Sequence, residues 1–259
     1  MPLVDTEDRG AVRHIVMTRA EKRNAMSGEM VVALGEAFKE AANDDSVRVV
    51  VVRGDGPMFS SGMDLSNLND LAGQAHMLRP FRAECIEAWN RLEEMTKPTI
   101  VQIHGACIGG AMELALAADM RVMAEDAVAG LLETRIGLIP DVGGCSRLPA
   151  VVGVGIAKEL IMTGRVFDGH EGHRIGFANR IAPADELDAA TEALTGELLA
   201  CAPIAVGLAK RVIDSAAKPA LAQTLEQEVT AQTVCAASDD FAEGAKPFLD
   251  KRDPEFAGR

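Results

Sequence analysis

Three acidic residues and two glycine-rich turns are the parts of this sequence that could do chemistry. Glu113 follows Gly110 by three residues, which places it on the same side of the first turn of a helix that starts at Gly109-Gly110. Glycine has no Cβ atom, so a ligand can come close to the backbone N–H groups that the start of a helix leaves unpaired. Residues 102–119 therefore predict an anion-friendly pocket beside a carboxylate. The alternative interpretation is that Glu113 has no role in a pocket and only interacts favourably with the helix dipole.

A second carboxylate, Glu133, follows a segment expected to be a buried strand and lies beside a Gly/Pro-rich loop. Removing such a carboxylate from water raises its pKa toward the range useful for proton transfer. A salt bridge to Arg135 or Arg147 is the alternative interpretation. Asp141 lies in the same loop, where it is a candidate cap for the helix expected to start at Gly143.

The glycine-interrupted segment 58–65 offers a further pocket wall. In one interpretation it is a loop with a helix cap at Asp64. In the functional interpretation, the turn around Gly62 supplies another backbone N–H group to the pocket.

Alternating strand and helix patterns must position these residues. Strands are expected over residues 11–18, 47–53, 99–104, 119–124, 127–131 and 179–182. Helices are expected over 27–42, 77–95 and 155–164, and then over 185–201, 203–217, 219–237 and 239–250. The change from alternation to helices alone predicts an α/β body over residues 1–200 and a helical region over 201–259.

The composition limits the partners of the protein. With 259 residues, 48% of them hydrophobic, the chain can bury a sizeable core. Its net charge of −13 argues against a nucleic-acid backbone or an anionic membrane as partner. We expect no metal site. The five cysteines contain no C-x-x-C pair, and the pair His170 and His173 has no third ligand nearby in the sequence. The chain lacks an apolar signal core and the roughly 18-residue apolar run of a membrane span, so we expect a cytoplasmic protein.

Four segments, in order and at the expected spacing, resemble the crotonase superfamily, also called the enoyl-CoA hydratase/isomerase family. They are TRAEKRNAMS (18–27), MFSSGMDL (58–65), HGACIGGAMELALAAD (104–119) and LLETRIGLIPDVGGCSRL (131–148). Residues 248–256 resemble the tail of the family. The resemblance implies an α/β spiral of β-β-α units with a C-terminal helical trimerisation region, and often two trimers stacked as a hexamer. It also implies an acyl-CoA substrate and no metal or redox cofactor.

The resemblance further implies roles for individual residues. Met63 and Gly110 would donate the two backbone N–H groups of an oxyanion hole. Glu113 would activate water for attack at C3 of a 2-trans-enoyl-CoA, and Glu133 would protonate C2 to give 3-hydroxyacyl-CoA. The residues expected to bind the rest of the substrate are Lys22, Arg23, Ser61, Asp64 and Leu65.

Asp141 departs from the hydratase pattern, which has a small residue at this position. Some dienoyl-CoA and ring-opened acyl-CoA isomerases of the family carry an Asp there, and a third acid can move a proton along the acyl chain. Those dienoyl isomerases commonly have Asp where this chain has Glu113. We therefore expect a hydratase, with a double-bond isomerase that uses Asp141 as the alternative. A non-catalytic RNA-binding protein is disfavoured, because the chain is negatively charged and has no segment in which basic and aromatic residues are interleaved.

Overall fold

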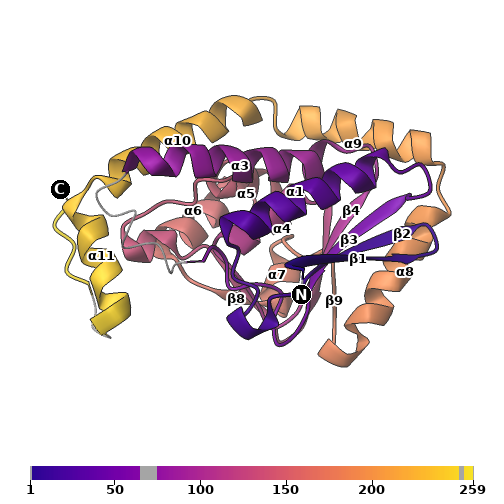
Figure 1. The fold of residues 1–259 in the computed structure, drawn as a ribbon, viewed down its shortest axis with the longest axis horizontal. Coiled ribbons are helices and arrows are strands. Elements are labelled where there is room, and N and C mark those ends of the chain that lie inside the picture. The colour runs from indigo at the N-terminus through magenta and orange to yellow at the C-terminus, as the bar shows by residue number, and fades with distance from the viewer. Residues whose placement is uncertain (1, 65–74, 251–253, 259) are drawn as a thin grey trace.

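The computed structural model describes residues 2–64, 75–250 and 254–258. Its centre is a six-stranded sheet in the order β1-β2-β3-β4-β6-β9 (Figure 1). The strands are β1 (Val4–Arg9), β2 (Val12–Met17), β3 (Val49–Gly54), β4 (Thr99–Ile103), β6 (Met120–Ala124) and β9 (Arg180–Ala182). β1 pairs with β2 in antiparallel fashion, and every other pair in this sheet is parallel.

Helices cover both faces of the central strands, which explains why β3 begins with a continuous run of four valines rather than an alternating pattern. Every residue of β4 is buried, as are the first four residues of β3. In Figure 1, α1 (Gly28–Asn43) and α3 (Ala75–Glu94) run above the strands and α8 (Leu187–Leu199) lies below them. The side chain of Ser27 accepts a hydrogen bond from Met30 N and caps α1.

A second sheet contains β5 (Ala106–Ile108), β7 (Val128–Gly130) and β8 (Phe167–Asp168). β5 follows β4 after a short turn at Gly105 and leads into α4 (Gly110–Ala117), and β7 follows β6 in the same way. The expected α/β fold built from strand–strand–helix units is therefore confirmed. The sequence patterns predict a strand over residues 99–104 and a helix that starts at Gly109-Gly110, and the structure adds β5 between them.

Most helices lie within a few residues of their predicted bounds. They are α6 (Val154–Thr163), α9 (Pro203–Ala217), α10 (Leu221–Ala236) and α11 (Asp239–Asp250), and α5 (Gly144–Val152) begins at the predicted glycine pair. The sequence patterns missed β1, β5, β8, the helix α7 (Gly169–Arg174) and the 3-10 helices η1 (Ala20–Lys22), η3 (Glu133–Ile136) and η4 (Ala184–Glu186). β1 was missed because it is a polar, largely exposed edge strand, held by backbone pairing rather than by a buried apolar face.

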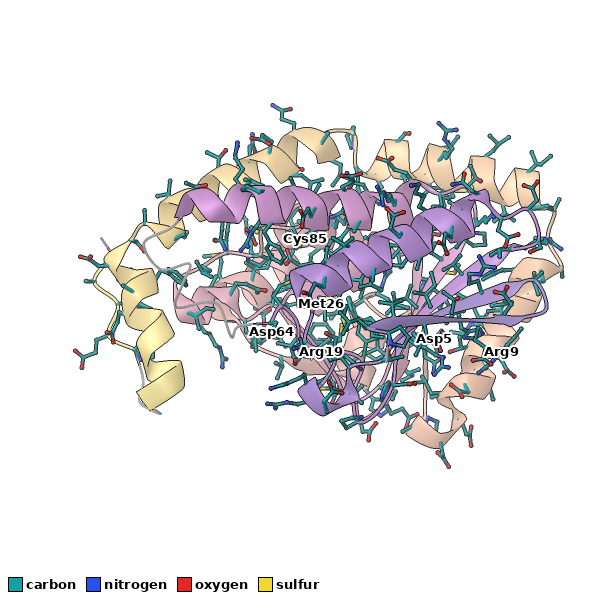
Figure 2. All side chains as sticks on the ribbon, in the orientation of Figure 1. Asp5, Arg9, Arg19, Met26, Asp64 and Cys85 are labelled. Atoms are coloured by element: carbon teal, nitrogen blue, oxygen red, sulfur yellow. The ribbon has the colours of Figure 1, made fainter. Side chains whose placement is uncertain are left out.

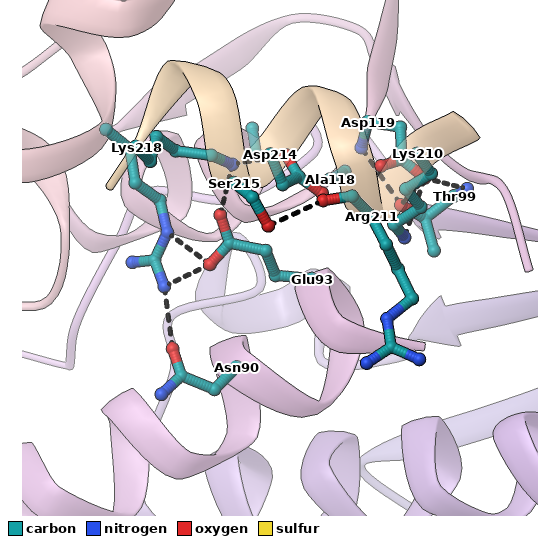
Figure 3. Close-up of polar contacts among 12 residues, drawn as sticks. Asn90, Glu93, Thr99, Ala118, Asp119, Lys210, Arg211, Asp214, Ser215 and Lys218 are labelled. Atoms are coloured by element: carbon teal, nitrogen blue, oxygen red, sulfur yellow. Dashed lines mark hydrogen bonds and ion pairs between the residues drawn. The ribbon is translucent and has the colours of Figure 1, made fainter. Parts of the chain in front are cut away.

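Ion pairs attach the C-terminal helices to the body. Lys210 of α9 pairs with Asp119 at 2.9 Å, and Lys218 pairs with Glu93 of α3 at 2.5 Å (Figure 3). Glu93 also accepts from the buried guanidinium of Arg147 at 2.7 Å. Figure 1 shows α10 running along α3. The domain boundary near residue 200 stays a prediction, although residues beyond it pack closely on the body.

The described residues include helices of limited apolar length and no large group of metal-binding side chains. No single helix among them has the length and apolar character to cross a membrane; one pair, Ala184–Leu199 with Pro203–Ala217, meets those criteria jointly and is bent by 104°. In the same part of the chain, no group of three or more His, Cys, Asp or Glu side chains is arranged to hold a metal ion. His170 lies on the surface with its side chain 64% exposed.

Candidate active site

A cavity of about 390 Å³ lies where the loop before residue 65, the start of α4, η3 and the C-terminal helices meet. Most of its wall is apolar and includes Met58, Phe81, Ile108, Leu138 and Phe241. The polar side chains in the wall include Glu113, Glu133, Asp141, Arg82 and Gln232. A mostly apolar pocket with a few convergent polar groups is the usual form of a small-molecule site.

The two glycine-rich turns that the sequence analysis singled out lie against each other. Gly62 has a φ of +93°, and a Cβ atom built on it would lie 2.4 Å from the carbonyl oxygen of Ile108 and 3.5 Å from Gly110 N. A Cβ atom on Gly110 would in turn lie 2.8 Å from the Met63 side chain.

Two backbone N–H groups at this contact are available to a ligand. In the described part of the chain, no hydrogen-bond acceptor is found for the N–H of Met63 or of Gly110. Gly110 is the first residue of α4, where a helix leaves N–H groups unpaired. The fold therefore places both groups beside one cavity.

Glu113 is buried in the first turn of α4, with only 2% of the residue exposed. Its Oε1 accepts hydrogen bonds from Val142 N and Gly144 N, both at 2.9 Å. Burial raises the pKa of this carboxyl well above its usual range, and the nearby acids Glu133 and Asp141 raise it further. The side chain thus bonds to a second segment inside the protein instead of lying exposed at a helix start.

Glu133 begins η3 and faces the glycine turn before α4. Its Oε1 would lie 2.8 Å from a Cβ atom on Gly109, and its Oε2 is buried without a hydrogen-bond partner among the described residues. Burial raises the pKa of Glu133 to about 7, in the direction that the sequence analysis expected. The alternative of a salt bridge is wrong: Arg147 pairs with Glu93, and Arg135 donates to the Thr163 carbonyl.

Asp141 does not cap α5, so the cap interpretation is wrong. The N-cap residue is Gly143, and Asp141 Oδ2 instead accepts a hydrogen bond from Arg82 Nε on α3. Both side chains are largely buried, at 6% and 11% exposed. Burial raises the pKa of Asp141, and the positive charge of Arg82 opposes that rise.

The start of α5 is capped from α10, by Glu228. Its Oε2 accepts from Gly143 N at 2.8 Å and its Oε1 from Ser146 N at 2.5 Å. Burial raises the pKa of Glu228 to about 7. Glu228, with 4% of the residue exposed, is therefore a fourth acid near Glu113, Glu133 and Asp141.

Gln232 lies one helical turn beyond Glu228 and lines the cavity. Its amide oxygen accepts from Ile139 N at 2.9 Å, and its Nε2 is buried with no acceptor among the described residues. Neither α10 residue was predicted from the sequence. The available signal was the buried apolar stripe of Leu225, Val229 and Ala236, because Glu228 and Gln232 fall on the same helix face.

The residues expected to bind the rest of the substrate are not all in the cavity wall. Arg23, Ser61 and Asp64 line it, and Asp64 pairs with Arg19 at 2.6 Å (Figure 2). Lys22 is exposed at the end of η1 and is not part of the wall. Leu65 lies outside the described residues.

Comparisons with known proteins agree on one family. The model of the Enoyl-CoA hydratase/isomerase family matches residues 7–259. The human Enoyl-CoA hydratase domain-containing protein 2, mitochondrial, is 37% identical over 96% of this chain and 86% of its own length. Mouse Methylglutaconyl-CoA hydratase, mitochondrial, is 34% identical over 98% of this chain and 85% of its own length. The crystal structure of an enoyl-CoA hydratase from Mycobacterium avium subsp. paratuberculosis K-10 is similar with a TM-score of 0.89 and 26% identity, over 98% of each chain.

Proposed function

Because this chain belongs to the enoyl-CoA hydratase/isomerase family, we propose that it adds water across the 2-trans double bond of an enoyl-CoA thioester. The product is a 3-hydroxyacyl-CoA. The observation that carries the proposal is a pair of carboxylates that share one cavity with the unpaired N–H groups of Met63 and Gly110. Glu113 is a buried residue, and the Oε2 atom of Glu133 is buried. The name of the mouse relative, a hydratase, supports the same reaction type.

The N–H groups of Met63 and Gly110 form the oxyanion hole in this proposal. Attack of water at C3 moves electrons through C2 onto the thioester oxygen, and two donors at that oxygen stabilise the enolate. Each preorganised donor contributes on the order of 3 kcal/mol to such a transition state. Gly110 begins α4, so the positive end of the helix dipole adds to the stabilisation.

The two glutamates divide the proton transfers. The two N–H groups on Oε1 of Glu113 fix its orientation, and the carboxylate takes a proton from water as the oxygen bonds to C3. Glu133 then gives its proton to C2. Its unpartnered Oε2 and its pKa of about 7 suit an acid that holds a proton near neutral pH. Each such transfer contributes roughly 10²–10⁴-fold to the rate.

A double-bond isomerase is the second candidate, favoured by one observation. Asp141 is buried and lines the same cavity, so it can reach an acyl chain there. Against it, Asp141 already accepts a hydrogen bond from Arg82, and Glu113 stands where the dienoyl isomerases that the sequence resembles commonly have Asp.

The assembly that we propose is a homotrimer, or a hexamer of two trimers. It is supported by an apolar stripe on α9, where Ile204, Leu208 and Val212 are 79%, 57% and 70% exposed at a spacing of four residues. Exposed apolar patches mark interaction surfaces. Light scattering should give three or six times the 27.4 kDa chain mass, and Leu208→Glu should lower it. A monomeric wild-type protein contradicts this assembly.

The reaction itself is tested with crotonyl-CoA, whose conjugated enoyl thioester absorbs in the ultraviolet and loses that absorbance on hydration. We expect turnover that is unchanged after dialysis against a chelator, because the proposal needs no metal or cofactor beyond the CoA of the substrate. No loss of absorbance with short-, medium- or long-chain enoyl-CoAs would defeat the proposal.

The cytoplasm is the location that we propose for this protein.

A further inference from the structure

Gln232 is a polar side chain in the cavity wall that the proposed hydration does not use. The residue is 2% exposed, and its oxygen must face Ile139 N, which donates to it. The NH₂ group therefore points the other way, and it finds no acceptor in the described part of the chain. A buried donor without a partner costs free energy that a suitable ligand atom would relieve.

Arg82 presents a second set of donors to the same cavity. Its Nε donates to Asp141, and among the described residues no acceptor is found for its two terminal NH₂ groups. The guanidinium lies over the ring of Phe81, 5.6 Å from the ring centre, which holds it against the apolar wall.

One short loop brings the two donors together. Gln232 is anchored to residue 139 and Arg82 to residue 141. Consecutive Cα atoms are about 3.8 Å apart, so the Cα atoms of residues 139 and 141 lie within about 8 Å of each other. Donors from α10 and α3 thus line one cavity, whose apolar wall is formed in part by Ile136, Leu138 and Phe241.

A purely aliphatic acyl chain would leave these donors unpaired. Resting on the function proposed above, we propose that the acyl chain of the substrate carries a distal oxygen group, and that Gln232 Nε2 and the Arg82 guanidinium bind it. The substrate class is then an enoyl-CoA whose chain ends in a hydrogen-bond acceptor. Gln232 and Arg82 are the specificity-determining residues for that class.

The charges around the site admit either a carboxylate or a neutral oxygen. Arg82 supplies a positive charge, while Asp141, Glu113 and Glu133 face the same cavity. Burial raises the pKa of Glu133 to about 7, and the neutral form of this acid does not repel a substrate carboxylate. The experiment therefore includes both kinds of oxygen group.

Three substrates of equal length test the proposal: trans-2-hexenoyl-CoA, its 6-hydroxy derivative and trans-2-hexenedioyl-CoA, which differ only at C6. We expect kcat/KM to be about tenfold or more higher for at least one oxygenated substrate, because a site that hydrogen-bonds a substrate group rejects the analogue that lacks it. The hydroxylated and carboxylated substrates then show which oxygen group the site prefers. Equal or higher kcat/KM for the aliphatic substrate overturns the proposal.

Gln232→Glu isolates the donor, because it keeps an oxygen for Ile139 N and replaces the NH₂ group by an acceptor. The preference for the oxygenated substrate should fall toward one. An equal loss of kcat/KM on all three substrates would overturn the proposal, because it would show that Gln232 stabilises the fold or positions the reacting water instead of binding the distal oxygen. Gln227→Glu places the same charge on the exposed face of α10 and is the matched control.

A binding measurement separates this proposal from the proposed reaction. Calorimetry with adipoyl-CoA and hexanoyl-CoA, which are saturated and cannot be hydrated, needs no turnover and no variant. Tighter binding of adipoyl-CoA, or of 6-hydroxyhexanoyl-CoA, supports the substrate class even if hydration fails. Hydration of hexenoyl-CoA without any preference in rate or binding leaves the proposed function intact and defeats the inference.

Discussion

Glu113 and Glu228 hold alternate backbone N–H groups at the start of the same helix. Glu113 of α4 accepts from Val142 and Gly144, and Glu228 of α10 accepts from Gly143 and Ser146. Two carboxylates from distant parts of the chain thus share the positive end of α5. Glu228 thus bonds to residues adjacent to those that fix the orientation of Glu113.

Replacing Glu228 should therefore weaken the fold. Glu228→Ala leaves two buried N–H groups without acceptors, and each unsatisfied buried group costs about 1–3 kcal/mol. Urea denaturation should show a loss of that order. Glu226→Ala on the same helix removes a glutamate whose side chain is 67% exposed, and should change stability little. Equal effects of the two variants would contradict the capping role.

Glu113→Gln should abolish most of the activity without unfolding the protein. The amide oxygen can still accept from Val142 N and Gly144 N, but the group can no longer take a proton from water. We expect kcat with crotonyl-CoA to fall by roughly 10²–10⁴-fold. Glu29→Gln, on the exposed side of α1, is the matched control. A Glu113→Gln enzyme within a few-fold of wild type would rule out the proposed base.

Glu133 should make stability depend on pH. Its pKa is raised from 4.5 to about 7 in the folded protein, so its contribution is fully present below the unfolded value and is lost as pH rises through about 7. Between roughly pH 5 and pH 8 the unfolding free energy of wild type, relative to Glu133→Gln, should fall by up to about 3 kcal/mol. Urea titrations across this pH range measure the unfolding free energy of both proteins. A difference in unfolding free energy that stays constant with pH would contradict the raised pKa of Glu133.

Gly62→Ala should separate the two turns that carry the oxyanion donors. Its positive φ disfavours a side chain, and the new Cβ atom would meet the Ile108 carbonyl at 2.4 Å. Displacing one donor should lower kcat by roughly 10²–10³-fold. Gly10→Ala carries a similar backbone strain, at a φ of +63°, but its Cβ atom meets nothing within 4 Å. Activity that falls equally in both variants would show that strain alone is responsible.

Asp141→Asn separates hydration from isomerisation. The change preserves the size of the side chain that Arg82 contacts but removes the acid. We expect hydration of crotonyl-CoA to fall by less than the roughly 10²-fold that loss of an acid–base group costs. Loss of hydration as complete as in Glu113→Gln would place Asp141 in the mechanism. If instead the protein isomerises 3-enoyl-CoA and the variant abolishes that activity, the isomerase is the better account.

Local patterns were sufficient for much of this protein. The β-branched run ending at Arg53 predicts a buried strand, and β3 occupies it. The spacing of Gly110 and Glu113 predicts a carboxylate beside a helix start, because three residues nearly complete a helical turn. Both are relationships among neighbours in the chain, which backbone geometry fixes without reference to the rest of the fold.

Tertiary packing decided what these residues contact. The sequence predicts Asp141 as a helix cap, yet in the fold α3 brings Arg82 to it. The cap comes instead from Glu228, which accepts a hydrogen bond from Gly143 N, 85 residues earlier in the chain. Such pairings depend on how α3 and α10 pack over the loop before α5, and on burial strong enough to require a partner for each polar group. The periodicity of a helix shows which face is buried, but only the assembled fold shows what that face meets.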